Sequence, residues 1–172
     1  GSLYFRLPVP AGVTFSSSDL PWIVKFLKNS HQYYLNEKYL EVLRNIHEMY
    51  EANPAPEMAM VEKFFEDYMS EVREHLEYEE KAAFPYFLSL VEKSSGIRPS
   101  FSAKVYLDHH SDIETKLSDL KQLLLVHLPV SDDYKARRRT IQSLMELEFD
   151  INVHTSVEEQ ILVPLVIAIE KQ

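Results

Sequence analysis

Two copies of one stretch, HLEYEEKAAFP at residues 75–85 and HTSVEEQILVP at residues 154–164, decide how this chain folds. Each copy has a His, a Glu four residues later, a second Glu at the next position and a Pro ten residues after the His. Positions i and i+4 of an α-helix lie on one face, one turn apart. Each copy can therefore present an imidazole nitrogen and a carboxylate to one point, as a metal-chelating helix does.

The composition of the 172-residue chain favours a helical protein and excludes several kinds of site. Hydrophobic residues make up 45% and charged residues 26% of it, which is ordinary for a globular protein. With only three Gly and few β-branched runs, helices are favoured over a sheet. Because there is no Cys, disulfides, thiolate metal sites and Cys nucleophiles are excluded. The net charge of -9 disfavours binding to nucleic acid.

The most apolar run, ILVPLVIAI at residues 161–169, is too short to cross a membrane, which takes about 20 residues. No secretory signal is recognisable at the start of the sequence. We therefore expect a cytoplasmic protein with no membrane partner. The same apolar run could pack against the N-terminal residues, against a second copy of the chain in a homodimer, or against a further domain.

Hydrophobic periodicity predicts four long amphipathic helices joined by short connections. Residues 1–18 contain prolines, a Gly and a Ser run, and are expected to form an extended arm. The helices are expected at about residues 20–51, 57–90, 100–127 and 132–170. This pattern favours an all-α fold, an up-down-up-down four-helix bundle that forms a single domain over residues 1–172. Pro164 is expected to kink or loosen the last helix.

A histidine interrupts the apolar seam of each predicted helix. These seam histidines are His31, His75, His110 and His154. In the second helix the seam continues through Glu79 and Ala82, and in the fourth through Glu158 and Ile161, in steps of four and three. An unpaired carboxylate on a buried seam costs several kcal/mol, so we expect a compensating charge beside both glutamates.

The four histidines also fall at about the same depth in an up-down bundle, since a helix rises 1.5 Å per residue. In the third helix His110 is in phase with the apolar seam, whereas His109 is one residue off it. His110 is therefore the preferred candidate of the two.

Together, the polar seam residues predict a centre of two metal ions. Imidazole and carboxylate donors without sulfur suit iron, manganese or zinc. Six side chains exceed the needs of one tetrahedral zinc ion, and two octahedral ions bridged by Glu79 and Glu158 fit better. Glu80 and Glu159 are expected to point off the seam. The predicted ligands are His31, His75, Glu79, His110, His154 and Glu158.

This arrangement resembles the hemerythrin-like (HHE) cation-binding domain. The pattern of that family is a lone His in helix one, His-x-x-x-Glu in helix two, a His in helix three, and His-x-x-x-Glu or -Asp in helix four. The resemblance covers residues 20–165 and implies a non-haem di-iron centre, oxo-bridged and carboxylate-bridged, inside the bundle. The segments EEKAAFP and EEQILVP further resemble the subgroup that repairs iron–sulfur centres. Oxygen carriers of the family have a bridging Asp where this chain has Glu158, which disfavours oxygen carriage.

By resemblance, the function is that of a di-iron protein of oxidative or nitrosative stress. Its centre would react with O2, NO or peroxide, or would supply iron for iron–sulfur cluster repair. One alternative is an iron- or oxygen-sensing regulatory module without turnover, and another is a metal-free structural bundle. Whether the chain is an enzyme stays open between these hypotheses.

Three lesser features also carry expectations. His47 could be a further histidine near the centre, but a place on the surface of the first helix is favoured. The run RRR at residues 137–139 is expected on a solvated helix face rather than in an anion-binding patch. Several tyrosines, Tyr106 among them, fall near the predicted layer. Most are expected to serve packing, and one could donate a hydrogen bond to a bridging oxygen.

Overall fold

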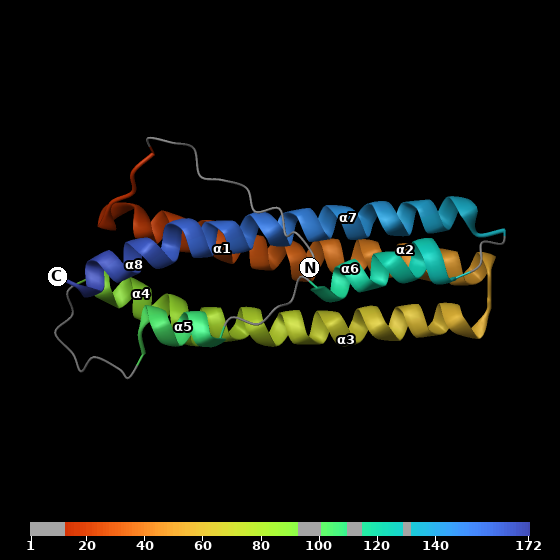
Figure 1. The fold of residues 1–172 in the computed structure, drawn as a ribbon, viewed down its shortest axis with the longest axis horizontal. Helices are drawn as coiled ribbons and strands as arrows, with labels where there is room; N and C mark the ends of the chain where they lie inside the picture. The colour runs from red at the N-terminus through yellow and green to blue at the C-terminus, as the bar shows by residue number, and fades with distance from the viewer. Residues whose placement is uncertain (1–12, 93–100, 110–114, 129–131) are drawn as a thin grey trace. The chain divides into compact units, whose positions relative to one another are not determined.

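A computed structural model describes residues 13–92, 101–109, 115–128 and 132–172 (Figure 1). These residues form helices and connecting turns and contain no strand, which confirms the all-α prediction. Within the same residues, no helix has the length and apolar character that crossing a membrane requires.

The helical elements follow one another with few interruptions. In chain order they are η1 (Ser17–Asp19), α1 (Leu20–Tyr33), η2 (Tyr34–Lys38), α2 (Tyr39–Ala52), α3 (Pro56–Tyr78), η3 (Glu79–Ala83), α4 (Phe84–Val91), α5 (Ala103–His109), α6 (Thr115–Gln122), η4 (Leu123–His127), α7 (Tyr134–Val157), η5 (Glu158–Leu162) and α8 (Val163–Glu170). Residues 1–12 of the expected arm lie outside the described residues. So do residues 110–114, in the third predicted helix, and with them His110.

The chain packs as two compact units. Unit 1 draws on residues 1–31, 75–111 and 152–172, and unit 2 on residues 32–74 and 112–151. Each unit has its own buried side chains. The expectation that the whole chain is a single domain stays a prediction.

Unit 1 is built on an apolar core, in which α8 packs against α4 and α5. The buried members are Leu20, Val24, Leu27, Ala83, Phe84, Tyr86, Phe87, Ala103, Tyr106, Leu162, Val163, Leu165 and Val166. Full burial of one such Leu or Phe contributes about 1.5–3 kcal/mol. This core holds together the chain segments that carry both copies of the repeated stretch.

Each copy of the repeated stretch contains a wide, π-helical turn immediately before its proline. The turn η3 begins at Glu79, and η5 begins at Glu158. The backbone N–H of Phe84 donates to the carbonyl of Glu79, five residues back, and that of Val163 donates likewise to Glu158. A proline in a regular helix lacks an N–H and crowds the carbonyl four residues before it. A widened turn before the proline accommodates both effects, so the predicted loosening at Pro164 takes the form of η5.

These π-turns shift the buried face by one residue, and two seam predictions are wrong for that reason. Ala82 and Ile161 were expected on the seam but are only half-buried, whereas Ala83 and Leu162 are fully buried. A π-turn takes one residue more than an α-turn closed at the same point, so the apolar face moves one position along the chain.

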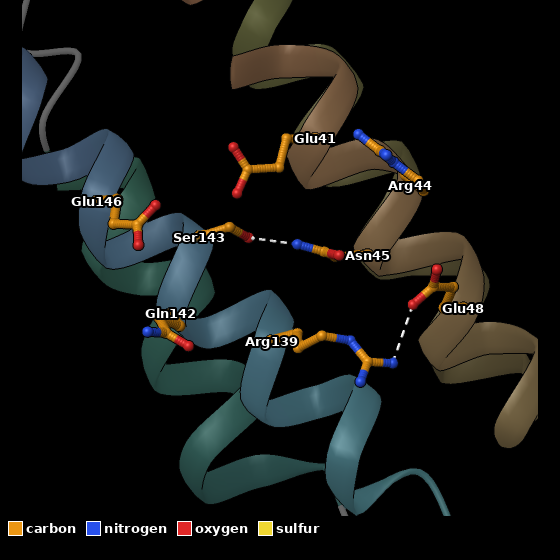
Figure 2. A pocket seen from close by; sticks show the side chains of 8 residues that line it. All are labelled: Glu41, Arg44, Asn45, Glu48, Arg139, Gln142, Ser143 and Glu146. Carbon is orange, nitrogen blue, oxygen red and sulfur yellow. Dashed lines mark hydrogen bonds and ion pairs between the residues drawn. The ribbon is translucent and has the colours of Figure 1, made fainter. Parts of the chain in front are cut away.

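Unit 2 carries a polar cleft between one face of α2 and one face of α7 (Figure 2). Its volume is about 380 Å³. Its lining residues are Glu41, Arg44, Asn45, Glu48, Arg139, Gln142, Ser143 and Glu146. Several of these groups bond across the cleft: Arg139 donates to Glu48 at 3.0 Å, and the amide of Asn45 donates to the Ser143 hydroxyl at 3.1 Å. These two bonds join α2 to α7 across the cleft.

Arg137 is buried in unit 2, which corrects the expectation of a solvated face at this residue, whereas Arg138 and Arg139 are exposed as expected. Its Nη2 donates to Asp133 Oδ2 at 2.6 Å, and its Nη1 donates to the carbonyl oxygens of Leu124 at 3.2 Å and Leu128 at 2.6 Å. The last carbonyls of a helix lack partners within that helix. Arg137 therefore closes the end of η4, and Asp133 balances its charge.

Replacing Arg137 by Met should destabilise the protein strongly, because the buried carboxylate of Asp133 would lose its cation. Removing one partner of a buried ion pair costs on the order of 3–5 kcal/mol. The free energy of unfolding in urea measures this loss. Arg138→Met is the matched control, since Arg138 is exposed and its loss should cost less than about 0.5 kcal/mol. Equal losses in the two variants would contradict the buried role of Arg137.

Candidate metal centre

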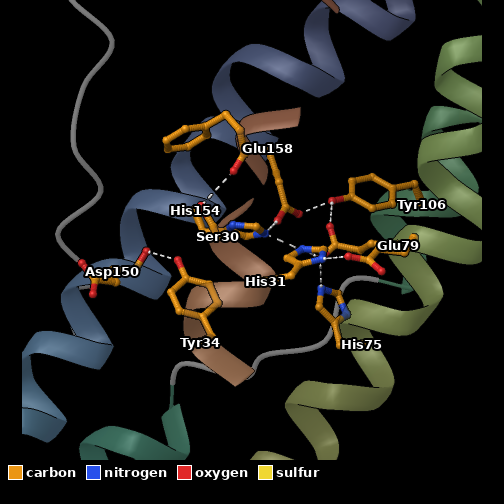
Figure 3. Close-up of polar contacts among 11 residues, drawn as sticks. Ser30, His31, Tyr34, His75, Glu79, Tyr106, Asp150, His154 and Glu158 are labelled. Carbon is orange, nitrogen blue, oxygen red and sulfur yellow. Dashed lines mark hydrogen bonds and ion pairs between the residues drawn. The ribbon is translucent and has the colours of Figure 1, made fainter. Parts of the chain in front are cut away.

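Three helical segments of unit 1 bring five of the six predicted ligands together (Figure 3). His31 comes from α1, His75 from the end of α3 with Glu79 after it, and His154 from the end of α7 with Glu158 after it. All five side chains are buried. The sixth predicted ligand, His110, lies outside the described residues.

The carboxylate of Glu79 is the meeting point of the three histidines. Its Oε1 lies 3.3 Å from the Nε2 of His75, 3.5 Å from the Nε2 of His31 and 3.7 Å from the Nε2 of His154. The i and i+4 spacing accounts for the contact with His75. The other two imidazoles arrive from α1 and α7, so the cluster depends on tertiary packing.

Glu158 repeats the i and i+4 contact in the second copy. Its Oε1 lies 2.5 Å from the Nε2 of His154, four residues earlier. The ring of His154 lies 5.0 Å from the ring of His31, centroid to centroid. The ring of Phe84 also stacks on His31, with centroids 5.6 Å apart. Stacking against an apolar core residue fixes the orientation of the His31 ring.

Two groups of three donors could each hold a metal ion. One consists of His31, Glu79 and His154, and the other of His75, Glu79 and Glu158. In each group the ligand atoms lie within 4.8 Å of one another. Glu79 belongs to both groups, which is the arrangement expected of a carboxylate shared by two ions.

The charges and bonds of the described residues fit bound metal. The Nε2 of His31 and the Oε1 of Glu79 are buried, yet neither atom makes a hydrogen bond to any residue that the structure describes. A buried polar atom without a hydrogen bond costs about 1–3 kcal/mol. A cation at this point would offset the cost for both atoms, and nitrogen and oxygen donors without sulfur suit iron, manganese or zinc.

Burial and the charges within the cluster shift the pKa values of its residues in opposite directions. Burial raises the pKa of Glu79, but the three imidazoles around it outweigh burial and hold the pKa well below its ordinary value. Burial lowers the pKa of His154, but the charge of Glu158 and, beyond it, the nearby carboxylate of Glu79 raise the pKa to about 10. Burial also lowers the pKa of His75, but the neighbouring carboxylate of Glu79 outweighs burial and raises the pKa. The carboxylate of Glu79 is thus held in the charged form that binds metal.

Glu80 makes a contact that its position off the seam did not predict. It is partly exposed, and its Oε1 lies 3.0 Å from the Nδ1 of His31. A carboxylate on one imidazole nitrogen orients the ring and directs the other nitrogen toward a metal. The doubled Glu in both copies of the repeat was the available signal for this role.

Tyr106 also belongs to the cluster. Its hydroxyl donates to the Oε2 of Glu79 at 3.0 Å and to the Oε2 of Glu158. Burial, together with the charges of the two carboxylates, raises the pKa of Tyr106, so the phenol keeps its proton. Tyr106, which was among the tyrosines expected near the layer, thus bonds both predicted bridging carboxylates.

His47 belongs to unit 2, whereas this cluster belongs to unit 1. Its side chain is half-exposed, and its Nε2 lies 2.6 Å from the Oε1 of Glu62. The placement agrees with the expectation of a surface residue on the first predicted helix.

Comparison with curated proteins finds no match, and comparison with solved structures finds none either. The family model described as the hemerythrin HHE cation binding domain matches residues 23–166, which include all six predicted ligands. Membership of that family implies metal binding, in agreement with the buried His and Glu groups. Since the match spans most of the chain, the chain belongs to the hemerythrin family of HHE cation-binding domains.

Proposed function

We propose that this chain is a non-haem di-iron protein. The observation that carries the proposal is the pair of three-donor groups that share Glu79. His31 and His154 would complete the ligands of one iron, and His75 and Glu158 those of the other. Glu158 Oε1 also lies beside His154, in the first group, which supports its role as a second bridge.

His110 is the sixth ligand of the proposed centre. It follows Tyr106 by four residues, which is the spacing of one helical turn, and Tyr106 bonds both carboxylates. The proposed scaffold is an up-down-up-down four-helix bundle, in which iron-binding side chains project inward from facing helices. The family match over residues 23–166 supports this arrangement.

Iron suits the proposed centre better than zinc. The donors are nitrogen and oxygen, with no Cys in the chain, and two groups share one carboxylate. Structural zinc takes four ligands in a closed tetrahedral site. Six side chains with shared carboxylates match two ions of higher coordination number, with positions left for exchangeable ligands.

The burial of the cluster restricts what can react there. The described ligand side chains are all buried, so only small molecules would reach them. A pair of irons can exchange electrons and bind a small ligand such as O2, NO or peroxide. We therefore propose a role in oxidative or nitrosative stress, either through reaction with these molecules or through supply of iron for iron–sulfur cluster repair.

The purified protein, loaded with ferrous iron without oxygen, should contain about two irons per chain, as a pair of shared-carboxylate sites requires. After exposure to air it should gain near-ultraviolet absorption from oxo-to-iron charge transfer. Elemental analysis and an optical spectrum before and after oxidation measure both. A single bound zinc ion, or no bound iron, would contradict the di-iron proposal.

Bound metal should stabilise the fold, because a ligand that binds only the native state raises its stability by about 2.7 kcal/mol at one hundred times its Kd. A chelator should therefore lower the Tm of the iron-loaded protein. In H75A and H154A this response should shrink and the iron content should fall. H47A is the matched control and should respond as the wild type does, because His47 is half-exposed and lies outside the cluster. An equal response in all four proteins would favour a metal-free structural role.

Removing the carboxylate that orients His31 should weaken metal binding with little loss of stability. Substitution of such an outer partner typically lowers metal affinity by about 10–100-fold. We expect a loss in this range for E80A, measured by titration with ferrous iron. E159A alters the corresponding residue of the second copy and serves as the comparison. Wild-type affinity in E80A would show that its contact with His31 has no part in binding.

A further inference from the structure

Tyr106 occupies a fixed place in the core of unit 1. Its side chain is fully buried, and its ring packs edge-on against Phe87 with centroids 5.4 Å apart and an interplanar angle of 85°. It lies on α5, whose first backbone N–H, that of Ala103, donates to the carboxylate of Glu170 at 3.3–3.4 Å. Packing of the ring and anchoring of the helix together leave the phenol little freedom to move.

The two oxygens of each bridging carboxylate face different neighbours. The Oε1 atoms of Glu79 and Glu158 face the histidines, and the Oε2 atoms face the hydroxyl of Tyr106. A phenol has one O–H, so its single proton is shared between two negatively charged groups. Hydrogen bonds to ionised acceptors are roughly twice as strong as neutral ones. Tyr106 therefore links two carboxylates that would otherwise repel each other.

From this geometry we infer that Tyr106 is a positioning residue, which holds Glu79 and Glu158 by their Oε2 atoms so that their Oε1 atoms point at the metal ions. The inference rests on the proposed di-iron function. In this role the phenol acts through the two carboxylates and is not itself a ligand. Loss of the Tyr106 hydroxyl should affect both metal groups, since the hydroxyl bonds Glu79, the carboxylate common to both.

The test compares Y106F with Y86F, which is its matched control. Tyr86 is also a buried tyrosine of unit 1, and its hydroxyl donates to a carboxylate, that of Glu170, at 2.5 Å. Both variants thus lose one phenol-to-carboxylate hydrogen bond, but only Y106F loses it at the proposed centre. Ferrous iron is titrated into each protein without oxygen, and the spectrum is recorded after oxidation.

We expect Y106F to bind the second iron about 10-fold or more weakly, since an outer partner of the ligands is lost. Its near-ultraviolet bands should also shift, because the carboxylates would no longer be held at Oε2. Y86F should match the wild type in both measurements, because Glu170 keeps its bond from the backbone N–H of Ala103 and still anchors α5. If Y106F does not fold, Y106M replaces it, because the flexible Met side chain fills irregular space without a hydroxyl donor.

Each other outcome overturns one defined statement. Iron binding and spectra that agree in all three proteins would remove the role of Tyr106 and leave the di-iron proposal standing. Equal weakening in Y106F and Y86F would make the effect a general one of packing. An intense visible band in the oxidised wild type that disappears in Y106F would make Tyr106 an iron ligand and so exclude the positioning role. No bound iron in the wild type would overturn the proposed function itself.

Discussion

The buried negative charge of Glu79 is the constraint on which the rest of unit 1 depends. Its carboxylate is fully buried, and three imidazoles from three chain segments surround its Oε1 at 3.3–3.7 Å. An ionised carboxylate in an apolar core is stable only when paired or bonded. The histidines and Tyr106 therefore have to converge on it. This requirement draws the segments around His31, His75 and His154 into one unit, and a bound cation would satisfy it most completely.

The proline of each repeat is explained by the backbone of the same site. A π-turn begins at each predicted bridging glutamate and closes on the residue before the proline. Such turns are rare and are found disproportionately at functional sites. In the two repeats, though not in η2 or η4, the turn begins at a carboxylate, and a regular helix follows it. The shared spacing of His, Glu and Pro in the two copies therefore reflects the same π-turn, which occurs once in each copy.

The predictable part of the site was the part that helix periodicity controls. The i and i+4 spacing and the apolar phase sufficed to select His75, Glu79, His154 and Glu158, and the same phase selected His31. The misses come from other causes. A single inserted residue moved the buried face from Ala82 to Ala83, and periodicity cannot reveal it. Glu80 lies off the seam, yet its long side chain reaches His31.

Charge pairing explains why some polar residues are buried in places where hydrophobic phase predicts exposure. Arg137 lies within a run of three arginines, but Asp133, one helical turn earlier, neutralises it inside unit 2. Glu170 in unit 1 differs, because it is only partly buried and its partners here are neutral: it accepts from the hydroxyl of Tyr86 and from the first turn of α5. That contact anchors the short helix bearing Tyr106. The cluster of buried carboxylates is therefore held from two directions: by histidines on one oxygen of each carboxylate, and on the other by a phenol whose helix is tied to α8.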